Sequence, residues 1–331
     1  MKKFFCIVAI LLSAEILSAQ EIKILTSGAN TSLRGLSVVN NETLWVSGSN
    51  GIVGKSIDGG NTWKWMTVKG FENIDFRDIE AFSAKKAIIM GTGSPSYILR
   101  TIDGGENWEL GYENKMKGMF LDAMTFWNEQ SGIVLGDPVN NRFFIGRTFD
   151  GGKTWQTIPE ANKPVAEKGE YCFAGSGTNI RKLNKGEAVF VTGGLVSRIY
   201  IRDKKMVLPI LQGKESAGAN SVAVKSRKTM IVAGGDFTQR NDTIKNCAIT
   251  HDGGATWVLP QRSPLGYRSC IEYLQKNKWI TCGLNGVDIS NDDGNTWSNI
   301  SKEGFHVCRE AKKGNTVYVA GSDGKVGKLI E

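Results

Sequence analysis

Histidine, proline and long apolar segments are all scarce in this chain of 331 residues. It has seven prolines and two histidines, His251 and His306. Two histidines cannot supply a histidine-rich metal site, and neither belongs to a recognisable catalytic triad. The sequence also lacks a Walker motif, a G-x-S-x-G motif and a dinucleotide-binding glycine motif. We therefore expect no metal, no nucleotide and no other cofactor.

Cysteine is present but lacks the usual functional spacings. No two cysteines form a C-x-x-C pair, which excludes the common zinc and thioredoxin patterns. A disulfide between Cys270 and Cys282 is conceivable in an oxidising compartment. Buried, free thiols are the favoured prediction. It applies to the five cysteines beyond the N-terminal segment, which are Cys172, Cys247, Cys270, Cys282 and Cys308.

The only marked apolar run lies at the N-terminus and is typical of a secretory signal peptide. Lys2 and Lys3 precede the apolar stretch 4–12, and the small-residue sequence "LSA" stands before Gln20. That stretch is far shorter than the ~20 residues of a membrane-spanning helix, which disfavours an uncleaved anchor. We predict a cleaved signal peptide over residues 1–19, a folded domain over 20–331, and export to the periplasm or the exterior.

An octapeptide with an acid, glycines and a tryptophan occurs five times. Its copies are "SIDGGNTW", "TIDGGENW", "TFDGGKTW", "THDGGATW" and "SNDDGNTW", ending at Trp63, Trp108, Trp155, Trp257 and Trp297. The gaps between these tryptophans are 45, 47, 102 and 40 residues, and the longest equals two periods. One repeat without the octapeptide therefore lies between Trp155 and Trp257.

Seven units share a strand-like segment that ends in glycine. These segments are "WVSG", "IIMG", "IVLG", "VFVTGG", "MIVAGG", "WITCG" and "VYVAG". Repeats of about 45 residues with short strands are typical of propeller blades. The seventh unit stops after its third strand, whereas "EIKILTS" (21–27) belongs to no other unit. We predict an all-β, seven-bladed β-propeller of four-stranded antiparallel blades, closed by the N-terminal strand completing the last blade.

The octapeptide is predicted to build a turn rather than an active site. Its aspartate can accept backbone N–H bonds, its second glycine can adopt positive φ, and its tryptophan can be buried between sheets. Five metal or sugar sites are disfavoured because each turn supplies one carboxylate. The residues assigned this structural role are Asp58, Trp63, Asp103, Trp108, Asp150, Trp155, Asp252, Trp257, Asp292 and Trp297.

Ligand binding is expected on the opposite face, where blade connections and second-to-third-strand loops gather around the channel. Charged residues at the inner-strand starts and in these loops predict a polar funnel. The candidate binding residues are Arg34, Arg77, Asp137, Arg142, Arg198, Asp236 and Arg268. Each alone is compatible with a solvated loop residue or an ion pair between blades. The set predicts a binding surface, and the net charge of +8, spread over scattered basic residues, favours acidic protein surfaces over nucleic acid.

The repeats resemble the Asp-box, or BNR, signature of sialidase-like propellers. The whole pattern resembles the photosystem II stability/assembly factor family. This resemblance implies an exported, non-enzymatic scaffold for protein partners, with an arginine patch that contacts a membrane-protein complex. Arg34, Arg77 and Arg268 are the candidates for that patch.

The alternative function is a glycoside hydrolase or a glycan-binding, sialidase-like propeller. Such an enzyme needs two carboxylates about 5–9.5 Å apart. The candidates are Asp78, Asp137, Glu170 and Asp236, with Asp122 as a further acid of the funnel. Their spacing singles out no pair, the chain lacks the early R-I-P motif of sialidases, and Trp127 alone is a free aromatic platform. The sequence thus favours a scaffold and leaves hydrolysis open.

Overall fold

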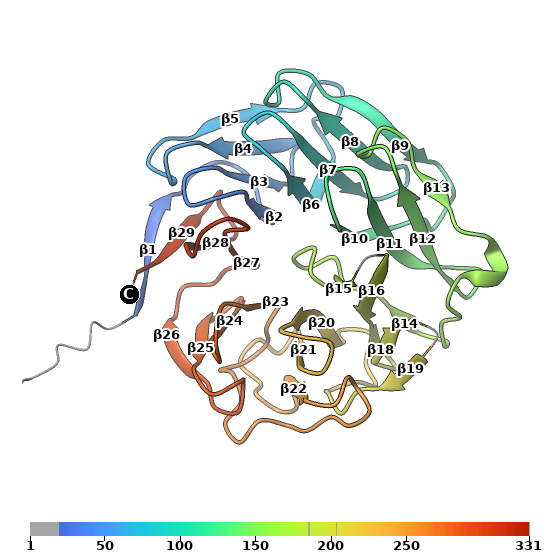
Figure 1. Ribbon diagram of the computed structural model, residues 1–331, viewed down its shortest axis with the longest axis vertical. Coiled ribbons are helices and arrows are strands. Elements are labelled where there is room, and N and C mark those ends of the chain that lie inside the picture. The colour runs from blue at the N-terminus through green and yellow to red at the C-terminus, as the bar shows by residue number, and fades with distance from the viewer. Residues whose placement is uncertain (1–19, 185, 203, 331) are drawn as a thin grey trace, which may run out of the picture.

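Seven antiparallel sheets stand as blades around a central channel in the computed structural model (Figure 1). The structure describes residues 20–184, 186–202 and 204–330, so the predicted signal peptide over 1–19 lies outside the described residues. Within these ranges, the one helical element is the 3₁₀ turn η1 (Glu160–Asn162). None of the helices described is long and apolar enough to cross a bilayer. The predicted all-β, seven-bladed fold is confirmed.

Blades one to three each consist of four consecutive strands, ordered from the channel outward. Blade one contains β2 (Leu33–Val38), β3 (Leu44–Gly48), β4 (Ile52–Ser56) and β5 (Lys64–Thr67). Blade two contains β6 (Asp75–Ala81), β7 (Ala87–Thr92), β8 (Ser96–Thr101) and β9 (Glu109–Asn114). Blade three contains β10 (Leu121–Phe126), β11 (Gly132–Val139), β12 (Arg142–Thr148) and β13 (Gln156–Thr157).

Blades four to six follow the same plan with local departures. Blade four contains β15 (Ile180–Asn184), β16 (Glu187–Val191), β18 (Arg198–Ile201) and β19 (Lys204–Val207). Blade five contains β20 (Ala217–Val224), β21 (Met230–Asp236) and β22 (Cys247–Thr250), extended through the short strands β17 (Gly193–Gly194) and β14 (Glu170–Tyr171). Blade six contains β23 (Cys270–Tyr273), β24 (Trp279–Gly283), β25 (Gly286–Ser290) and β26 (Ser298–Ser301).

The two ends of the described chain meet in blade seven. This blade contains β27 (Val307–Glu310), β28 (Val317–Ala320), β29 (Val326–Ile330) and, as its outer strand, β1 (Glu21–Thr26). β1 runs antiparallel to β29, with Ile22 opposite Leu329 and Ile24 opposite Gly327. Figure 1 shows the blue first strand beside the red last one. The predicted closure of the ring by the N-terminal strand is therefore correct.

The apolar core lies between neighbouring blades. Trp45 in blade one is fully buried, meets Trp108 of blade two edge-on at 6.5 Å, and donates its indole N–H to the Ser83 carbonyl at 3.0 Å. Trp279 of blade six is equally buried but lies one position earlier in its strand, opposite Ser290. It packs in a core cluster with Ile231 and Ile249 of blade five. Both indole rings thus pack against a neighbouring blade, and both N–H groups have acceptors, that of Trp279 being Asp293 at 3.1 Å. The buried indole N–H groups of Trp108, Trp155 and Trp257 have no partner among the described residues. The five cysteines of the described chain are buried and free.

The five octapeptide turns share one hydrogen-bond pattern. In blade one, Asp58 Oδ1 accepts the Thr62 N–H at 2.9 Å and the Ser56 hydroxyl at 2.8 Å, while Ser56 Oγ accepts the Gly60 N–H at 2.9 Å. Hydrogen bonds from the residue four positions later hold the pKa of Asp58, Asp103 and Asp252 at about 2. Asp150 and Asp292 accept the equivalent N–H bonds at 3.0 and 2.8 Å. Each box carboxylate is therefore occupied within its own turn.

Candidate binding pocket at the channel mouth

A cavity of about 360 Å³ opens where the inner strands begin. We call it the channel-mouth pocket, and every blade contributes to its wall. Its lining residues are Arg34, Arg77, Phe120, Cys172, Phe173, Ala174, Gly175, Asn220, Phe237, Tyr267, Ser269, Leu284 and His306. Because the strands alternate in direction, the octapeptide turns after each third strand lie on the other face. The volume falls in the range of pockets that hold a small ligand or part of a peptide.

The same backbone irregularity recurs in four inner strands. The pairing register shifts around Arg34 in β2, Arg77 in β6, Asp122 in β10 and Asn220 in β20, leaving each as the extra residue of a bulge. A β-bulge redirects a side chain that would otherwise follow the alternation of the strand. Three of these residues, Arg34, Arg77 and Asn220, line the pocket. The repeated bulge therefore equips the channel mouth with polar side chains.

Arg34 and Arg77 give one side of the pocket its positive charge. The Arg77 Nε donates to the Asp75 carboxylate at 2.7 Å, and its guanidinium lies 5.8 Å from the centre of the Phe120 ring. Arg34 donates to the Gly175 carbonyl at 3.3 Å, and no carboxylate of the described chain is within ion-pair distance of it. Burial, followed by repulsion from Arg77, lowers the pKa of Arg34. The charge of Arg34 is thus the least compensated in the pocket.

His306 lies beside these arginines as a neutral base. Its Nδ1 is 3.0 Å from the Leu33 carbonyl oxygen, which identifies Nδ1 as the protonated nitrogen. Burial, reinforced by the positive charge of Arg34, lowers the pKa of His306 to about 4. The histidine therefore contributes a polar surface without adding charge near neutral pH.

The opposite side of the pocket is aromatic. Phe237 packs edge-on against Phe173 at 5.8 Å and against Tyr267 at 6.4 Å, and it remains partly exposed. The Tyr267 hydroxyl donates to Asn220 Oδ1 at 2.8 Å, which fixes both side chains. These residues come from the connections before blades four and six and from the loop after β21. Two guanidiniums facing an aromatic wall suit a carboxylate attached to an apolar group.

A cluster of two carboxyl groups and a thiol lies behind the pocket wall. Asp122, Asp137 and Cys172 each bring one potential ligand atom within 4.8 Å of the others. Asp137 Oδ1 accepts the Cys172 backbone N–H at 2.8 Å. Burial and the neighbouring Asp137 raise the pKa of Asp122 well above its usual range, and burial raises that of Asp137 to about 6. Only Cys172 of the three lines the cavity.

Other predicted binding residues are held inside the blades. Arg198 donates from Nε to Glu170 at 3.1 Å, and Arg268 donates from Nε to Asp288 at 2.6 Å, with both arginines buried. Asp236 is buried, accepts the Thr238 N–H at 2.9 Å and lies 3.4 Å from the Lys214 amine. Arg142 donates to the Lys163 carbonyl at 2.8 Å, beside a small cavity between blades two and three. The structure thus brings only Arg34 and Arg77 to the pocket, with Asp137 behind it.

Three of the four candidate hydrolytic acids are likewise engaged in the fold. Asp78 lies at the other end of the channel, where it accepts the Ile79 and Met124 amides at 2.8 and 2.7 Å. Burial raises its pKa to about 7. Glu170 accepts the Thr192 hydroxyl at 2.6 Å in addition to its arginine partner, and Asp236 has the partners given above. Only Asp137 adjoins another carboxyl group, that of Asp122.

The cavity at the other end of the channel is larger, about 430 Å³, and several of its charges form ion pairs. Arg181 contacts Glu272 at 2.6 Å, Arg309 contacts the same carboxylate at 3.4 Å, and Lys312 contacts Glu80 at 2.7 Å. Lys182 and Lys313 also line this cavity without an ion pair among the described residues, but both are exposed to solvent, whereas the unpaired Arg34 of the channel mouth is partly buried. The channel-mouth pocket is therefore the stronger candidate.

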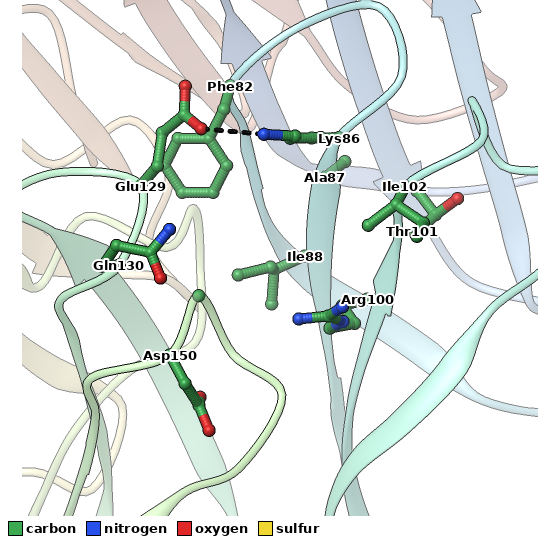
Figure 2. Close-up of a pocket in the computed structure, with 11 residues that line it drawn as sticks. Phe82, Lys86, Ala87, Ile88, Arg100, Thr101, Ile102, Glu129, Gln130 and Asp150 are labelled. Atoms are coloured by element: carbon green, nitrogen blue, oxygen red, sulfur yellow. Dashed lines mark hydrogen bonds and ion pairs between the residues drawn. The ribbon is translucent and has the colours of Figure 1, made fainter.

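A third cavity, of about 190 Å³, lies between blades two and three on the face of the octapeptide turns (Figure 2). Lys86 and Glu129 form an ion pair of 3.2 Å at its edge, and Ile88 lines it from blade two. Asp150 borders it from blade three with its carboxylate pointing away from Ile88. The Asp150 carboxylate is occupied by the Thr154 amide at 3.0 Å. This cavity arises where an octapeptide turn packs on its neighbour, and we assign it no function.

The aromatic wall was not among the residues predicted from the sequence. Phe120 directly precedes the strand of Asp122, and Phe173, Phe237 and Tyr267 lie in the same connections and loops as the predicted charged residues. Aromatic residues in loops around a propeller channel are the signal that would have identified them. Asn220 carried no such signal, because its exposure to the channel depends on the bulge in β20.

Comparisons with known proteins agree with the fold and the repeats. The family model described as Photosynthesis system II assembly factor YCF48 matches residues 15–326. A search of curated proteins finds no significant match. Among solved structures, YCF48 bound to a D1 peptide has 17% sequence identity and a TM-score of 0.67, covering 96% of this chain and 96% of that one.

Two further solved structures show the same architecture. YCF48 from Cyanidioschyzon merolae is 16% identical with a TM-score of 0.67, covering 94% of this chain and 99% of that one. The WD40 β-propeller domain of Doa1 is 12% identical with a TM-score of 0.65, covering 94% and 97%. At these identities, the structural likeness establishes the fold alone. The family model, which spans most of the sequence, confirms the resemblance seen in the repeats, and the chain therefore belongs to the Photosynthesis system II assembly factor YCF48 family.

Proposed function

We propose that this protein is an exported, non-enzymatic scaffold that binds a segment of a protein partner in the channel-mouth pocket. The observation that carries the proposal is the pair Arg34 and Arg77 opposite the aromatic wall of Phe173, Phe237 and Tyr267. Arg34 has no carboxylate partner in the described chain, so a carboxylate from another protein would complete it. A peptide-bound structure within the same family supports a peptide as the ligand.

The ligand we infer is a peptide segment with a carboxylate next to an apolar or aromatic side chain. The carboxylate, from an acidic side chain or a chain terminus, would accept hydrogen bonds from the two guanidiniums. The apolar group would cover Phe237 and Leu284, which are both partly exposed at the rim. A membrane-protein complex is the kind of partner that the family membership favours.

A capture experiment from the envelope fraction of the native cells tests this proposal. The wild-type protein should retain a partner, and retention should weaken as salt rises, because guanidinium–carboxylate attraction is screened. Arg77→Glu and Arg34→Glu should each weaken binding of the identified partner by about tenfold or more. Arg227→Glu is the matched control, since its side chain is 59% exposed and lies in the loop after β20, away from the pocket.

Specific outcomes would overturn the proposal. If both arginine variants and Arg227→Glu retain the partner equally, the pocket is not the binding site. If no partner is retained and the protein hydrolyses a defined glycan, the hydrolase alternative takes its place. Export is tested separately. N-terminal sequencing of the natural protein should find Gln20 as its first residue, and cell fractionation should find the protein outside the cytoplasm.

A further inference from the structure

The inner strand of blade three holds a buried carboxylate without a partner. Asp122 is the bulge residue of β10, the position that Arg34 and Arg77 occupy in blades one and two. Its side chain is 0% exposed, and neither carboxylate oxygen has a hydrogen-bond partner among the described residues. The Asp137 amide faces this carboxylate but donates to the Phe120 carbonyl at 2.9 Å. Buried polar groups are almost always bonded, so this one needs an explanation.

The groups nearest to it form a coordination set. Asp137 and Cys172 each place an oxygen or sulfur atom within 4.8 Å of an Asp122 oxygen, from two further elements of the chain. The Cys172 backbone N–H orients Asp137 through a 2.8 Å hydrogen bond, as outer partners commonly orient metal ligands. Among the residues that the structure describes, no other group of three such side chains brings its ligand atoms this close.

We propose that Asp122, Asp137 and Cys172 form a Zn²⁺ site with its fourth position open to the channel-mouth pocket. A thiolate beside two carboxylates suits this borderline-soft ion, whereas Mg²⁺ and Ca²⁺ take oxygen ligands only. Cys172 lines the pocket, so a water molecule or a ligand carboxylate can reach the open position from the channel. Binding displaces the thiol proton and the protons held by the two carboxyl groups to solvent, which leaves one thiolate and two carboxylates as ligands.

The site lies within the field of the pocket arginines. Arg77 acts electrostatically on Asp122 and lines the same cavity. Two carboxylates and a thiolate around a dication leave one net negative charge, which Arg77 attracts although it is also paired with Asp75. Zinc would therefore fix the pocket wall between β11 and β14 and add a Lewis-acidic position beside the guanidiniums.

Zinc titration of the metal-free, full chain tests this assignment. Calorimetry should detect one Zn²⁺ per chain, and Co²⁺ as a probe should give the charge-transfer absorption of a thiolate ligand. Asp122→Asn and Cys172→Ser should each lower the affinity by about tenfold or more. Cys247→Ala is the matched control, because it removes another buried, free thiol and should leave zinc binding unchanged.

Three results would refute the site. The first is that the wild type binds no zinc. The second is that Asp122→Asn and Cys172→Ser bind zinc as tightly as the wild type. The third is that Cys247→Ala loses as much zinc affinity as Cys172→Ser. Far-ultraviolet circular dichroism and thermal unfolding without zinc check that each variant is folded. If Asp122→Asn is not folded, Asp137→Asn replaces it, because Asp137 is only half-buried. The expected loss of zinc affinity is the same. Zinc should also raise the unfolding temperature of the wild type but not of the ligand variants.

Discussion

Arg268 and Asp288 form an ion pair that is almost wholly removed from solvent, with side chains 0% and 1% exposed. The Arg268 Nε donates to Asp288 Oδ2 at 2.6 Å, and its other N–H groups reach the carbonyl oxygens of Tyr267 and Leu265 at 2.9 and 2.7 Å. The pair fastens the connection before blade six to β25, the third strand of that blade. An arginine that family resemblance suggests as a contact residue is thus built into the fold.

Replacing this arginine should destabilise the protein rather than weaken partner binding selectively. Arg268→Met leaves the Asp288 carboxylate buried and unpaired, which should lower the free energy of unfolding by about 3–5 kcal/mol. Urea unfolding measures this loss. Arg77→Met is the control, since the Arg77 side chain is 29% exposed and should cost far less. A stability of Arg268→Met equal to that of Arg77→Met would contradict a structural role for the buried pair.

The glycine at the fifth position of the octapeptide should tolerate alanine poorly because it lies against the neighbouring blade. Gly294 has φ +86°, and a Cβ there would lie 2.3 Å from Ile231 Cδ1 of blade five. Gly70 has a similar φ of +84° with nothing within 4 Å. Both alanine variants should lose about 1–2 kcal/mol from the left-handed backbone. Gly294→Ala should lose about 1–3 kcal/mol more from overpacking. Urea unfolding of the two variants separates these contributions, and equal losses would rule out the contact with Ile231.

His306 should make the protein less stable in mild acid. Its folded pKa of about 4 lies below the ordinary value of 6.5, so the unfolded chain binds more protons between these two values. The free energy of unfolding should therefore fall as pH drops from about 6.5 to 4, by an amount on the order of 3 kcal/mol. His306→Asn should remove this part of the slope. The exposed His251→Asn is the control and should follow the wild type.

Several buried acids titrate in the opposite sense, so the comparison between variants carries the result. Burial raises the pKa of Asp78 to about 7, and a raised carboxyl pKa contributes stability that is lost as pH rises. The raw pH profile of the wild type combines these effects. The difference between the wild-type and His306→Asn profiles isolates the histidine. A difference that is flat between pH 6.5 and 4 would show that His306 is not buried as a neutral base.

The fold could be predicted from sequence because its repeats are local. Each octapeptide encodes a complete turn, in which Asp58 and its counterparts bond to residues within four positions. The spare strand at 21–27 and the last unit, which lacks its fourth strand, predicted how the ring closes. That inference needs only a count of the strands in each unit. Blade four lacks the octapeptide, yet β18 and β19 still pair, because the alternation of their residues suffices there.

The site was only partly predictable, since it depends on contacts between distant segments. In the sequence, Arg77 and Arg268 look alike, as both begin an inner-strand segment. Only the structure shows that Asp288 lies against Arg268, while Arg34 has no carboxylate partner among the residues described. The bulges that turn Arg34, Arg77 and Asp122 out of register leave no mark in composition or spacing. Charge at the strand starts was therefore a real signal, but it did not distinguish pocket residues from buried ion pairs.

The pairing of β1 with β29 also constrains when the molecule can be completed. Ile22 meets Leu329 across more than three hundred residues, so β1 is synthesised long before β29 is available to pair with it. Until then its hydrogen-bonding edge stays open, and such edges invite association with other chains. Contacts of this sequence separation form slowly. In the interval between the synthesis of these two strands, a holding chaperone that covers the open edge of β1 is compatible with the architecture.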